Sequence, residues 1–221
     1  MPVRRCVLLS VLLCGFGASS QAGVIDFETG SFILGLGQTG RVQGFNFTAG
    51  GQPNSVLLVP TIAANCIPDC VSNGTSTLSA VNGATVTIDS ILPGGFDLRS
   101  FDVAGTATIG STRNATSMRV IGNLFGGGQV TQTFLIDPTA FQTLTLNSAF
   151  VNLSSAEFDG IQPIGFNSPE FQLDNIVYAA PSTTLSGVPE PASIVLIASV
   201  LFAAPLKSAL RKQLSNQKGV I

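Results

Sequence analysis

The side chains in this chain that could do acid–base, nucleophilic or metal chemistry are carboxylates and thiols. There is no His among the 221 residues, which excludes Ser-His-Asp and Cys-His catalysis and imidazole metal sites. Between Gly23 and Val188 there is also no Lys, so a Ser-Lys hydrolase is excluded there. Eleven carboxylates lie in that stretch, but the sequence does not select two of them as the facing pair of a glycosidase. We therefore expect no enzyme activity.

The same stretch is acidic. Four Arg against eleven acids give it a net charge of −7. Binding to nucleic acid or to an anionic membrane surface needs clustered Lys and Arg. We therefore expect no nucleic-acid partner, and divalent cations or neutral polysaccharide fit this charge better.

Two cysteines, Cys66 and Cys70, lie in the stretch and enclose a turn-like segment. In an oxidising compartment such a pair most simply forms a local disulfide. A zinc site would need two more soft ligands, and the stretch offers neither another Cys nor a His. A redox-active pair is the alternative, although no cationic residue stands beside either thiol.

The first 22 residues read as a secretory signal peptide. Two Arg precede an apolar stretch, and small residues at Ser20 and Ala22 occupy the positions that signal peptidase reads. We predict cleavage between Ala22 and Gly23. A lipoprotein signal at Cys14 is the alternative, but Leu stands before it where a small residue is required.

At the other end, a proline-rich motif precedes an apolar segment and several basic residues. The motif consists of Val188, Pro189, Glu190 and Pro191. Residues 192–206 are apolar and short for a transmembrane helix, but they can span a bilayer if the flanking Lys and Arg snorkel. The positive-inside rule places the tail, residues 213–221, in the cytoplasm.

Residues 188–212 resemble the PEP-CTERM sorting signal, in which Val-Pro-Glu-Pro-Ala, a short transmembrane helix and basic residues follow one another. This signal is also catalogued as the C-terminal domain of some ice-binding proteins. The resemblance implies recognition and processing by an exosortase, a membrane protease of Gram-negative bacteria that make extracellular polysaccharide. Pro205 and the dispersed basic residues depart from the pattern.

Hydrophobicity alternates with period two through the body of the chain, as in half-buried strands. The clearest strands cover residues 42–47, 84–88, 96–103, 131–136 and 171–176. Turn residues separate them, and Asn82-Gly83 predicts a two-residue hairpin. About ten short strands without a long helix predict a single antiparallel β-sandwich of jelly-roll type. We place this domain at 23–180, followed by a linker at 181–187.

Phe residues at alternating strand positions are expected in the core of this sandwich. They are Phe45, Phe47, Phe96, Phe101, Phe134, Phe158 and Phe171.

The first and last strands of the body resemble those of jelly-roll carbohydrate-binding modules. The resemblance is carried by the segments 25–28 (Ile-Asp-Phe-Glu) and 171–176 (Phe-Gln-Leu-Asp-Asn-Ile). In such modules the two strands lie side by side, and acids on them can hold a structural calcium ion through oxygen ligands. The resemblance implies Glu28 and Asp174 as calcium ligands and Asp26 as a weaker third. Alternatively, these are solvated residues at strand ends.

Two further features bear on the ligand. Sugar sites usually stack a sugar on an aromatic ring, but this chain has no Trp and one Tyr, Tyr178. Thr-x-Thr pairs recur, and aligned Thr ladders form the surfaces of ice-binding proteins, but the pairs are irregularly spaced. They are Thr85/Thr87, Thr106/Thr108, Thr131/Thr133 and Thr143/Thr145.

The sequence thus predicts an exported, non-enzymatic protein of the cell surface or extracellular matrix in a Gram-negative bacterium that forms exopolysaccharide or biofilm. Its C-terminal helix would anchor it transiently in the inner membrane. Signal peptidase and an exosortase are the expected processing partners, and exopolysaccharide is the further partner considered, while the sequence does not identify a specific ligand. A calcium-stabilised carbohydrate-binding module is the alternative reading, and an ice-binding protein is a minor one.

Overall fold

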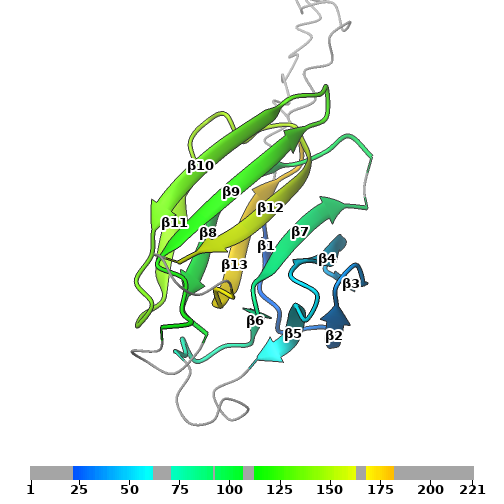
Figure 1. Ribbon diagram of the computed structural model, residues 1–221. Helices are drawn as coiled ribbons and strands as arrows, with labels where there is room; N and C mark the ends of the chain where they lie inside the picture. Colours follow the sequence, from blue (N-terminus) through cyan, green and yellow to red (C-terminus); the bar gives the residue numbers. More distant parts are fainter. Residues whose placement is uncertain (1–21, 62–70, 92, 107–111, 163–167, 182–221) are drawn as a thin grey trace, which may run out of the picture. The chain divides into compact units, whose positions relative to one another are not determined.

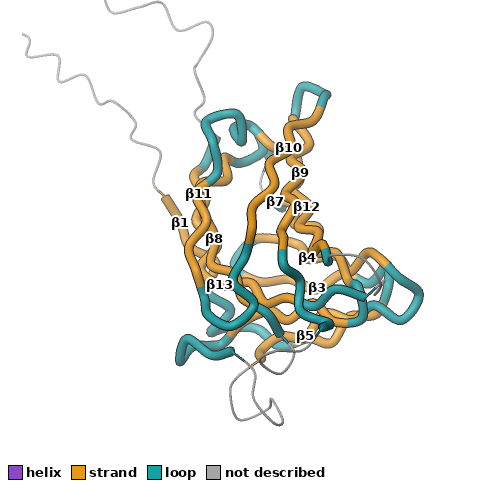
Figure 2. Tube along the Cα trace, turned by 60° about the vertical axis from the view of Figure 1, so that its left-hand side comes forward, coloured by secondary structure: helices purple, strands orange, loops and turns teal. Residues whose placement is uncertain are grey.

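The computed structural model describes residues 22–61, 71–91, 93–106, 112–162 and 168–181 (Figure 1). The chain divides into two compact units, Met1–Ser182 and Thr183–Ile221, and every described residue lies in the first. These residues form thirteen strands and no helix, and Figure 2 draws them as strands and loops alone. Within the described ranges nothing helical could therefore cross a membrane.

The strands are β1 (Ala22–Ile25), β2 (Phe32–Gly35), β3 (Thr39–Val42), β4 (Phe45–Gly51), β5 (Val56–Thr61), β6 (Thr77–Val81), β7 (Ala84–Ser90), β8 (Asp97–Ala104), β9 (Ser117–Leu124), β10 (Gln129–Leu135), β11 (Gln142–Thr145), β12 (Leu153–Ile161) and β13 (Phe171–Ala179). They make two antiparallel sheets. The first has the order β11-β8-β13-β6-β5-β2, with β1 also paired to β13, and the second has the order β10-β9-β12-β7-β4-β3. The predicted all-β sandwich is confirmed.

One continuous core lies between the sheets. In β7, Ala84, Val86 and Ile88 are buried while the intervening Thr residues are partly exposed, so the period-two pattern places one face against the other sheet. The sheets meet through aromatic pairs: Phe101 of β8 lies edge-on to Phe158 of β12, with ring centroids 5.0 Å apart. Of the seven Phe residues expected in the core, six are buried and Phe134 is partly buried against it.

The predicted hairpin at Asn82-Gly83 is wrong, although the turn itself is present. Both residues have positive φ, 58° and 72°, as a tight two-residue turn requires. However, β6 pairs with β5 and β13 in the first sheet, whereas β7 pairs with β4 and β12 in the second. The turn therefore carries the chain from one sheet to the other.

β1 and β13 lie side by side, as the resemblance implied for the first and last strands, but β1 ends at Ile25, so residues 26–28 of the expected first strand lie beyond it. Val24 of β1 pairs with Val177 of β13, and Ala22 pairs with Ala179. Other predicted features lie outside the described residues. These are the signal peptide up to residue 21, the Cys66–Cys70 disulfide, the motif at 188–191 and the helix at 192–206.

Candidate functional site

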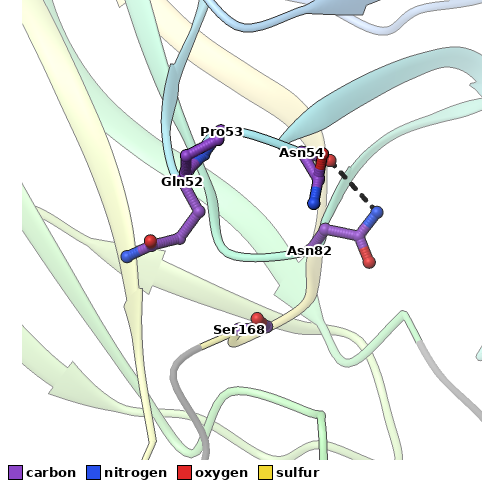
Figure 3. Close-up of a pocket in the computed structure, with 5 residues that line it drawn as sticks. All are labelled: Gln52, Pro53, Asn54, Asn82 and Ser168. Atoms are coloured by element: carbon purple, nitrogen blue, oxygen red, sulfur yellow. Dashed lines mark hydrogen bonds between the residues drawn. The ribbon is translucent and has the colours of Figure 1, made fainter.

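A pocket of about 360 Å³ lies at one end of the sandwich (Figure 3). Gln52, Pro53 and Asn54 line it from the loop between β4 and β5. Asn82 comes from the turn between β6 and β7, and Ser168 from the segment that leads into β13. Three connections that are distant in sequence thus converge on one pocket with amide side chains in its wall.

Asn82 holds two of these connections together. Its side-chain amide donates to the Asn54 carbonyl at 3.2 Å, and its own carbonyl accepts from the buried Ser55 hydroxyl at 3.4 Å. The loop itself turns tightly, because the Ser55 N–H donates to the Gln52 carbonyl at 2.9 Å. Asn tolerates the left-handed backbone conformation that this turn requires, so the position favours Asn for both its backbone and its side chain.

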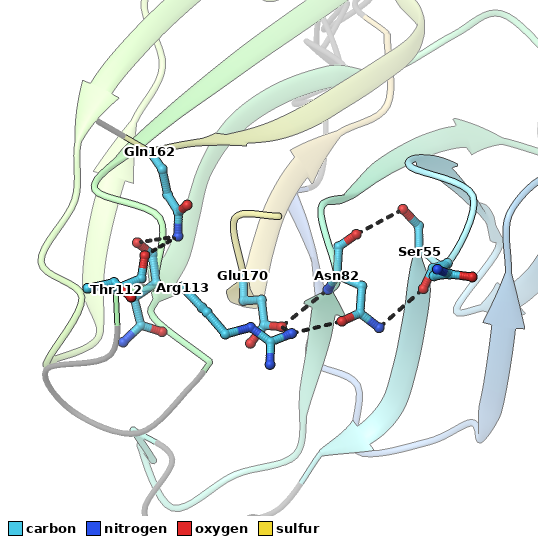
Figure 4. Close-up of polar contacts among 8 residues, drawn as sticks. Ser55, Asn82, Thr112, Arg113, Gln162 and Glu170 are labelled. Carbon is cyan, nitrogen blue, oxygen red and sulfur yellow. Dashed lines mark hydrogen bonds and ion pairs between the residues drawn. The ribbon is translucent and has the colours of Figure 1, made fainter. Parts of the chain in front are cut away.

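An ion pair between Arg113, whose side chain is about half exposed, and the buried Glu170 contacts Asn82 (Figure 4). Arg113 pairs with Glu170, of which 4% is exposed, and donates to the Asn82 side-chain oxygen at 2.8 Å. The Asn82 N–H donates to the Glu170 carboxylate at 3.3 Å. Burial raises the pKa of Glu170, while the Asn82 N–H and the Arg113 charge oppose that rise. The two charged groups therefore interact with each other, and each also forms a hydrogen bond with Asn82.

The segment that carries Arg113 is fixed through its backbone. The Glu170 N–H donates to the Arg113 carbonyl at 2.8 Å, and the Ala115 N–H donates to the Glu170 carbonyl at 2.9 Å. The side-chain amide of Gln162 donates to the Thr112 carbonyl at 2.6 Å (Figure 4). The wall behind the pocket is thus held by short bonds between segments far apart in sequence, which makes the pocket preformed.

The side chains of Gln52 and Asn54 are exposed, and neither amide has a hydrogen-bond partner among the described residues. Each amide can donate two hydrogen bonds and also accept. Such groups match hydroxyl groups, which also donate and accept. Because Arg113 and Glu170 neutralise each other, the pocket suits an uncharged ligand that carries many hydroxyls.

Two of the predicted calcium ligands contact the same loop, and the third does not. Glu28 accepts hydrogen bonds from the Ser76 N–H at 2.9 Å and the Ser76 hydroxyl at 3.3 Å. Asp174 accepts from the Asn73 amide at 2.7 Å and the Thr75 hydroxyl at 2.8 Å. Residues 73–76 therefore connect the loop that follows β1 with β13.

Asp26 instead accepts a bond from the Gln43 side chain at 2.7 Å. Across the part of the chain that the structure describes, no three His, Cys, Asp or Glu side chains come together as a metal site would require. The donors around Asp174 occupy both of its oxygens, since the Asn175 N–H donates to the second at 2.8 Å. Calcium at Glu28 and Asp174 stays a prediction, and a melting temperature lowered by chelator would support it.

Tyr178 is used in packing. Its ring lies over Gly23, where an added Cβ would come 2.5 Å from the ring. It also stands edge-on to Phe45, with centroids 4.7 Å apart and an angle of 71° between the rings. A smaller, mostly apolar cavity of about 130 Å³ is lined by both rings and by Phe96. It lies near the end of β13, whereas the amide-lined pocket lies before its start.

The Thr pairs do not form one ladder. Thr85/Thr87 lie on β7 and Thr131/Thr133 on β10, and the second sheet places β12 and β9 between them. Glu157 stands opposite Thr87 on β12, and Ile121 opposite Thr131 on β9. The pair on β11 belongs to the other sheet. The continuous Thr surface that ice binding requires is absent from the described strands.

Sequence reasoning missed the amide-lined pocket. Gln52-Pro53-Asn54 signalled a loop, and Asn82 signalled a turn, but their convergence depends on strands that enter different sheets. Asn82 was the one available signal, because it tolerates the positive φ of the turn and also supplies a side chain that can make hydrogen bonds.

Fold and site together define a β-sandwich with a preformed polar pocket at one end. No family model matches this chain, and no curated protein matches it. Similar solved structures include a family 29 carbohydrate-binding module, with a TM-score of 0.44 and 11% identity over 79% of this chain and 97% of that one. A variant of such a module gives 0.44 and 12% over 78% and 99%. Another variant, complexed with mannohexaose, gives 0.39 and 10% over 77% and 99%. With TM-scores and identities this low, the ligands of those modules cannot be assigned to this chain.

Proposed function

We propose that this chain is an exported, non-catalytic protein that binds neutral polysaccharide in the pocket formed by Gln52, Pro53, Asn54, Asn82 and Ser168. The observation that carries the proposal is a pair of free amide side chains, Gln52 and Asn54, in a preformed pocket of about 360 Å³. A volume in this range is typical of small-ligand sites.

The chemistry of the pocket favours sugar hydroxyls over charged groups. Free amides can bond to neighbouring hydroxyls as donor and acceptor at once. The ring of Pro53 offers an apolar surface to the C–H face of a sugar. The net charge of −7 between residues 23 and 188 disfavours anionic polymers.

Affinity electrophoresis in gels containing neutral or anionic polysaccharides tests the proposal. A neutral polysaccharide should retard the full-length chain, and the double variant Gln52→Ala/Asn54→Ala should bind at least about tenfold more weakly, because several hydrogen bonds are lost. Its melting temperature should not change, since both side chains are exposed.

Gln142→Ala is the matched control, because it removes an amide on β11, far from the pocket in the sheet order. Retardation of the double variant equal to that of the unchanged chain would contradict the proposal. So would retardation by anionic polysaccharides alone.

Export and retention form a separate part of the proposal, which rests on the signal peptide and on the motif at 188–191. After sorting by an exosortase, the body would act in the exopolysaccharide layer outside the cell. Mass spectrometry of the exported chain from a host with an active exosortase should show an end near Pro189–Pro191. A chain that keeps residues 192–221 after export would overturn this part.

A further inference from the structure

In the described part of the chain five strands pair with a neighbour on one side only, and one of these edges differs from the others. The edge strands β1, β2, β3 and β11 have four residues each, whereas β10 (Gln129–Leu135) has seven. Natural edges are usually short, charged, bulged or interrupted by Pro, because a long free edge can pair with another strand. β10 has no charged residue and no Pro, and its register with β9 runs without a shift.

The phase of the β9–β10 ladder shows which backbone groups of β10 are free. The Leu124 N–H donates to the Gly128 carbonyl, and the Ile136 N–H to the Thr116 carbonyl, each at 3.0 Å. In an antiparallel pair every second residue bonds to the partner strand. Val130, Gln132 and Phe134 therefore bond to β9, and Gln129, Thr131 and Thr133 direct their N–H and C=O groups away from it.

These outward groups have no backbone partner among the described residues. The neighbouring Leu135 carbonyl accepts from the Gln142 side chain at 3.3 Å, which marks where the edge becomes covered. The Thr131 and Thr133 side chains are exposed, and Leu135 is 84% exposed. Two consecutive outward residues, with Gln132 between them, thus form an open and uncharged edge.

We propose that β10 pairs antiparallel with β10 of a second copy of this chain, on a two-fold axis through Gln132. In this register Thr131 of one copy faces Thr133 of the other, and both residues have outward backbone groups. Each such pair exchanges reciprocal hydrogen bonds. Their side chains form Thr–Thr pairs on the outer face of the joined sheets, which is a favourable cross-strand combination.

Two observations favour a second copy as the occupant of this edge. The free groups are symmetric about Gln132, so the edge is complementary to itself, as a two-fold interface requires. The body is otherwise acidic, and this charge would repel another copy on most surfaces, but the edge itself is uncharged. β10 of a second copy therefore matches this edge in length, in the positions of its outward N–H and C=O groups, and in its lack of charge.

Sedimentation velocity of the purified full-length chain over a range of concentrations tests this inference. We expect a monomer–dimer equilibrium, and we expect Thr131→Pro to raise the dissociation constant at least about tenfold, because it removes an edge N–H in both copies. The β9 ladder does not use that N–H, so the melting temperature should change little. Thr39→Pro on the edge strand β3 is the matched control and should leave the dimer unchanged.

Cross-linking provides a second measurement in case Thr131→Pro does not fold. Gln132 lies opposite itself across the axis in a non-hydrogen-bonded pair, where Cα atoms about 4.5 Å apart permit a disulfide. Gln132→Cys should therefore form covalent dimers under mild oxidation faster than Thr131→Cys and faster than the unchanged chain. A chain that stays monomeric would overturn the inference, as would a dimer that survives Thr131→Pro or equal cross-linking rates for all three proteins.

Discussion

At the scale of single residues, Asp174 is the most deeply buried carboxylate among the described residues. It has no exposed surface, and it lies on β13 between the core residues Leu173 and Ile176. Burial raises the pKa of Asp174, and repulsion from Asp102 on the neighbouring strand adds to this. Hydrogen bonds from Asn73, Thr75 and Asn175 oppose it. Both oxygens of this buried carboxyl group are thus satisfied by hydrogen bonds, from Asn73 and Thr75 on one and from Asn175 on the other.

This arrangement predicts an unusual pH dependence. Because the folded pKa of Asp174 is above its ordinary 3.8, folding favours the protonated form, and that contribution is lost as the pH rises through the folded pKa. The free energy of unfolding of the unchanged chain, relative to Asp174→Asn, should therefore fall as the pH is raised from about 4 towards neutral pH. Urea unfolding of both proteins across this range measures it.

Asp137 provides the opposite control. Hydrogen bonds from the Thr139 side chain and backbone lower the pKa of Asp137, so its contribution is present at neutral pH and lost as the pH falls. The difference between the unchanged chain and Asp137→Asn should run in the reverse direction. A difference for Asp174→Asn that rises with pH would contradict the assignment.

The resemblance to jelly-roll modules was enough to predict part of this arrangement. Glu28 and Asp174 were expected to lie close together, and both do contact residues 73–76. Their partners could not be foreseen, because Asn73 and Thr75 lie about a hundred residues from Asp174 in sequence. The carboxylates were visible in the sequence, but the donors that occupy them depend on tertiary structure.

At the scale of elements, β9 depends on a glycine for its fit to the core. An added Cβ at Gly122 would lie 2.8 Å from Leu153, 2.9 Å from Val130 and 3.2 Å from Phe150. All three contacts are side chains packed in the core or against it. The absence of a side chain at this position therefore lets β9 lie close beneath the loop before β12.

We expect Gly122→Ala to destabilise the fold by about 1–3 kcal/mol, because overpacking a filled core forces its neighbours to move. Gly126 in the β9–β10 turn has no atom within 4 Å of an added Cβ. Gly126→Ala should therefore stay within about 0.5 kcal/mol of the unchanged chain. Denaturant unfolding of both variants tests this, and equal stabilities would mean that Gly122 has free space.

The strands themselves were largely predictable, but their pairing was not. Alternation located β7, β8, β10 and β13, because burial on one face leaves a period-two pattern. The stretch 42–47 nevertheless hides a turn at Gln43-Gly44, where both residues have positive φ. Gln is unusual in that conformation, so the residue types at these positions did not predict a turn. Likewise, Asn82-Gly83 specifies a turn but does not determine which sheet the next strand joins.

At the scale of the whole body, the amide-lined pocket and the points where the described body begins and ends lie at opposite ends of β13. Ser168 precedes the first residue of that strand, and Ala22 pairs with Ala179, its last residue. Nine residues of strand span roughly 30 Å. A ligand in the pocket therefore lies far from the point where the described chain enters and leaves.

This separation predicts how attachment affects binding. A bulky polymer coupled through Ala180→Cys should leave polysaccharide binding unchanged, because residue 180 is exposed just beyond the end of β13. The same polymer coupled through Asn54→Cys should abolish binding, because it fills the pocket. Comparing each protein before and after coupling separates the effect of the substitution from that of the polymer. Equal losses at both positions would place the ligand elsewhere.

The pairing of β1 with β13 also has a mechanical consequence. If the body is held beyond Ala179 and pulled by a ligand near Ser168, tension runs along β13. Its hydrogen bonds to β8 on one side, and to β6 and β1 on the other, lie across that direction. Such bonds are loaded in shear and must fail together, whereas bonds pulled from one end open one at a time. If the proposed anchor and ligand site are correct, β13 would therefore carry the load between them in shear.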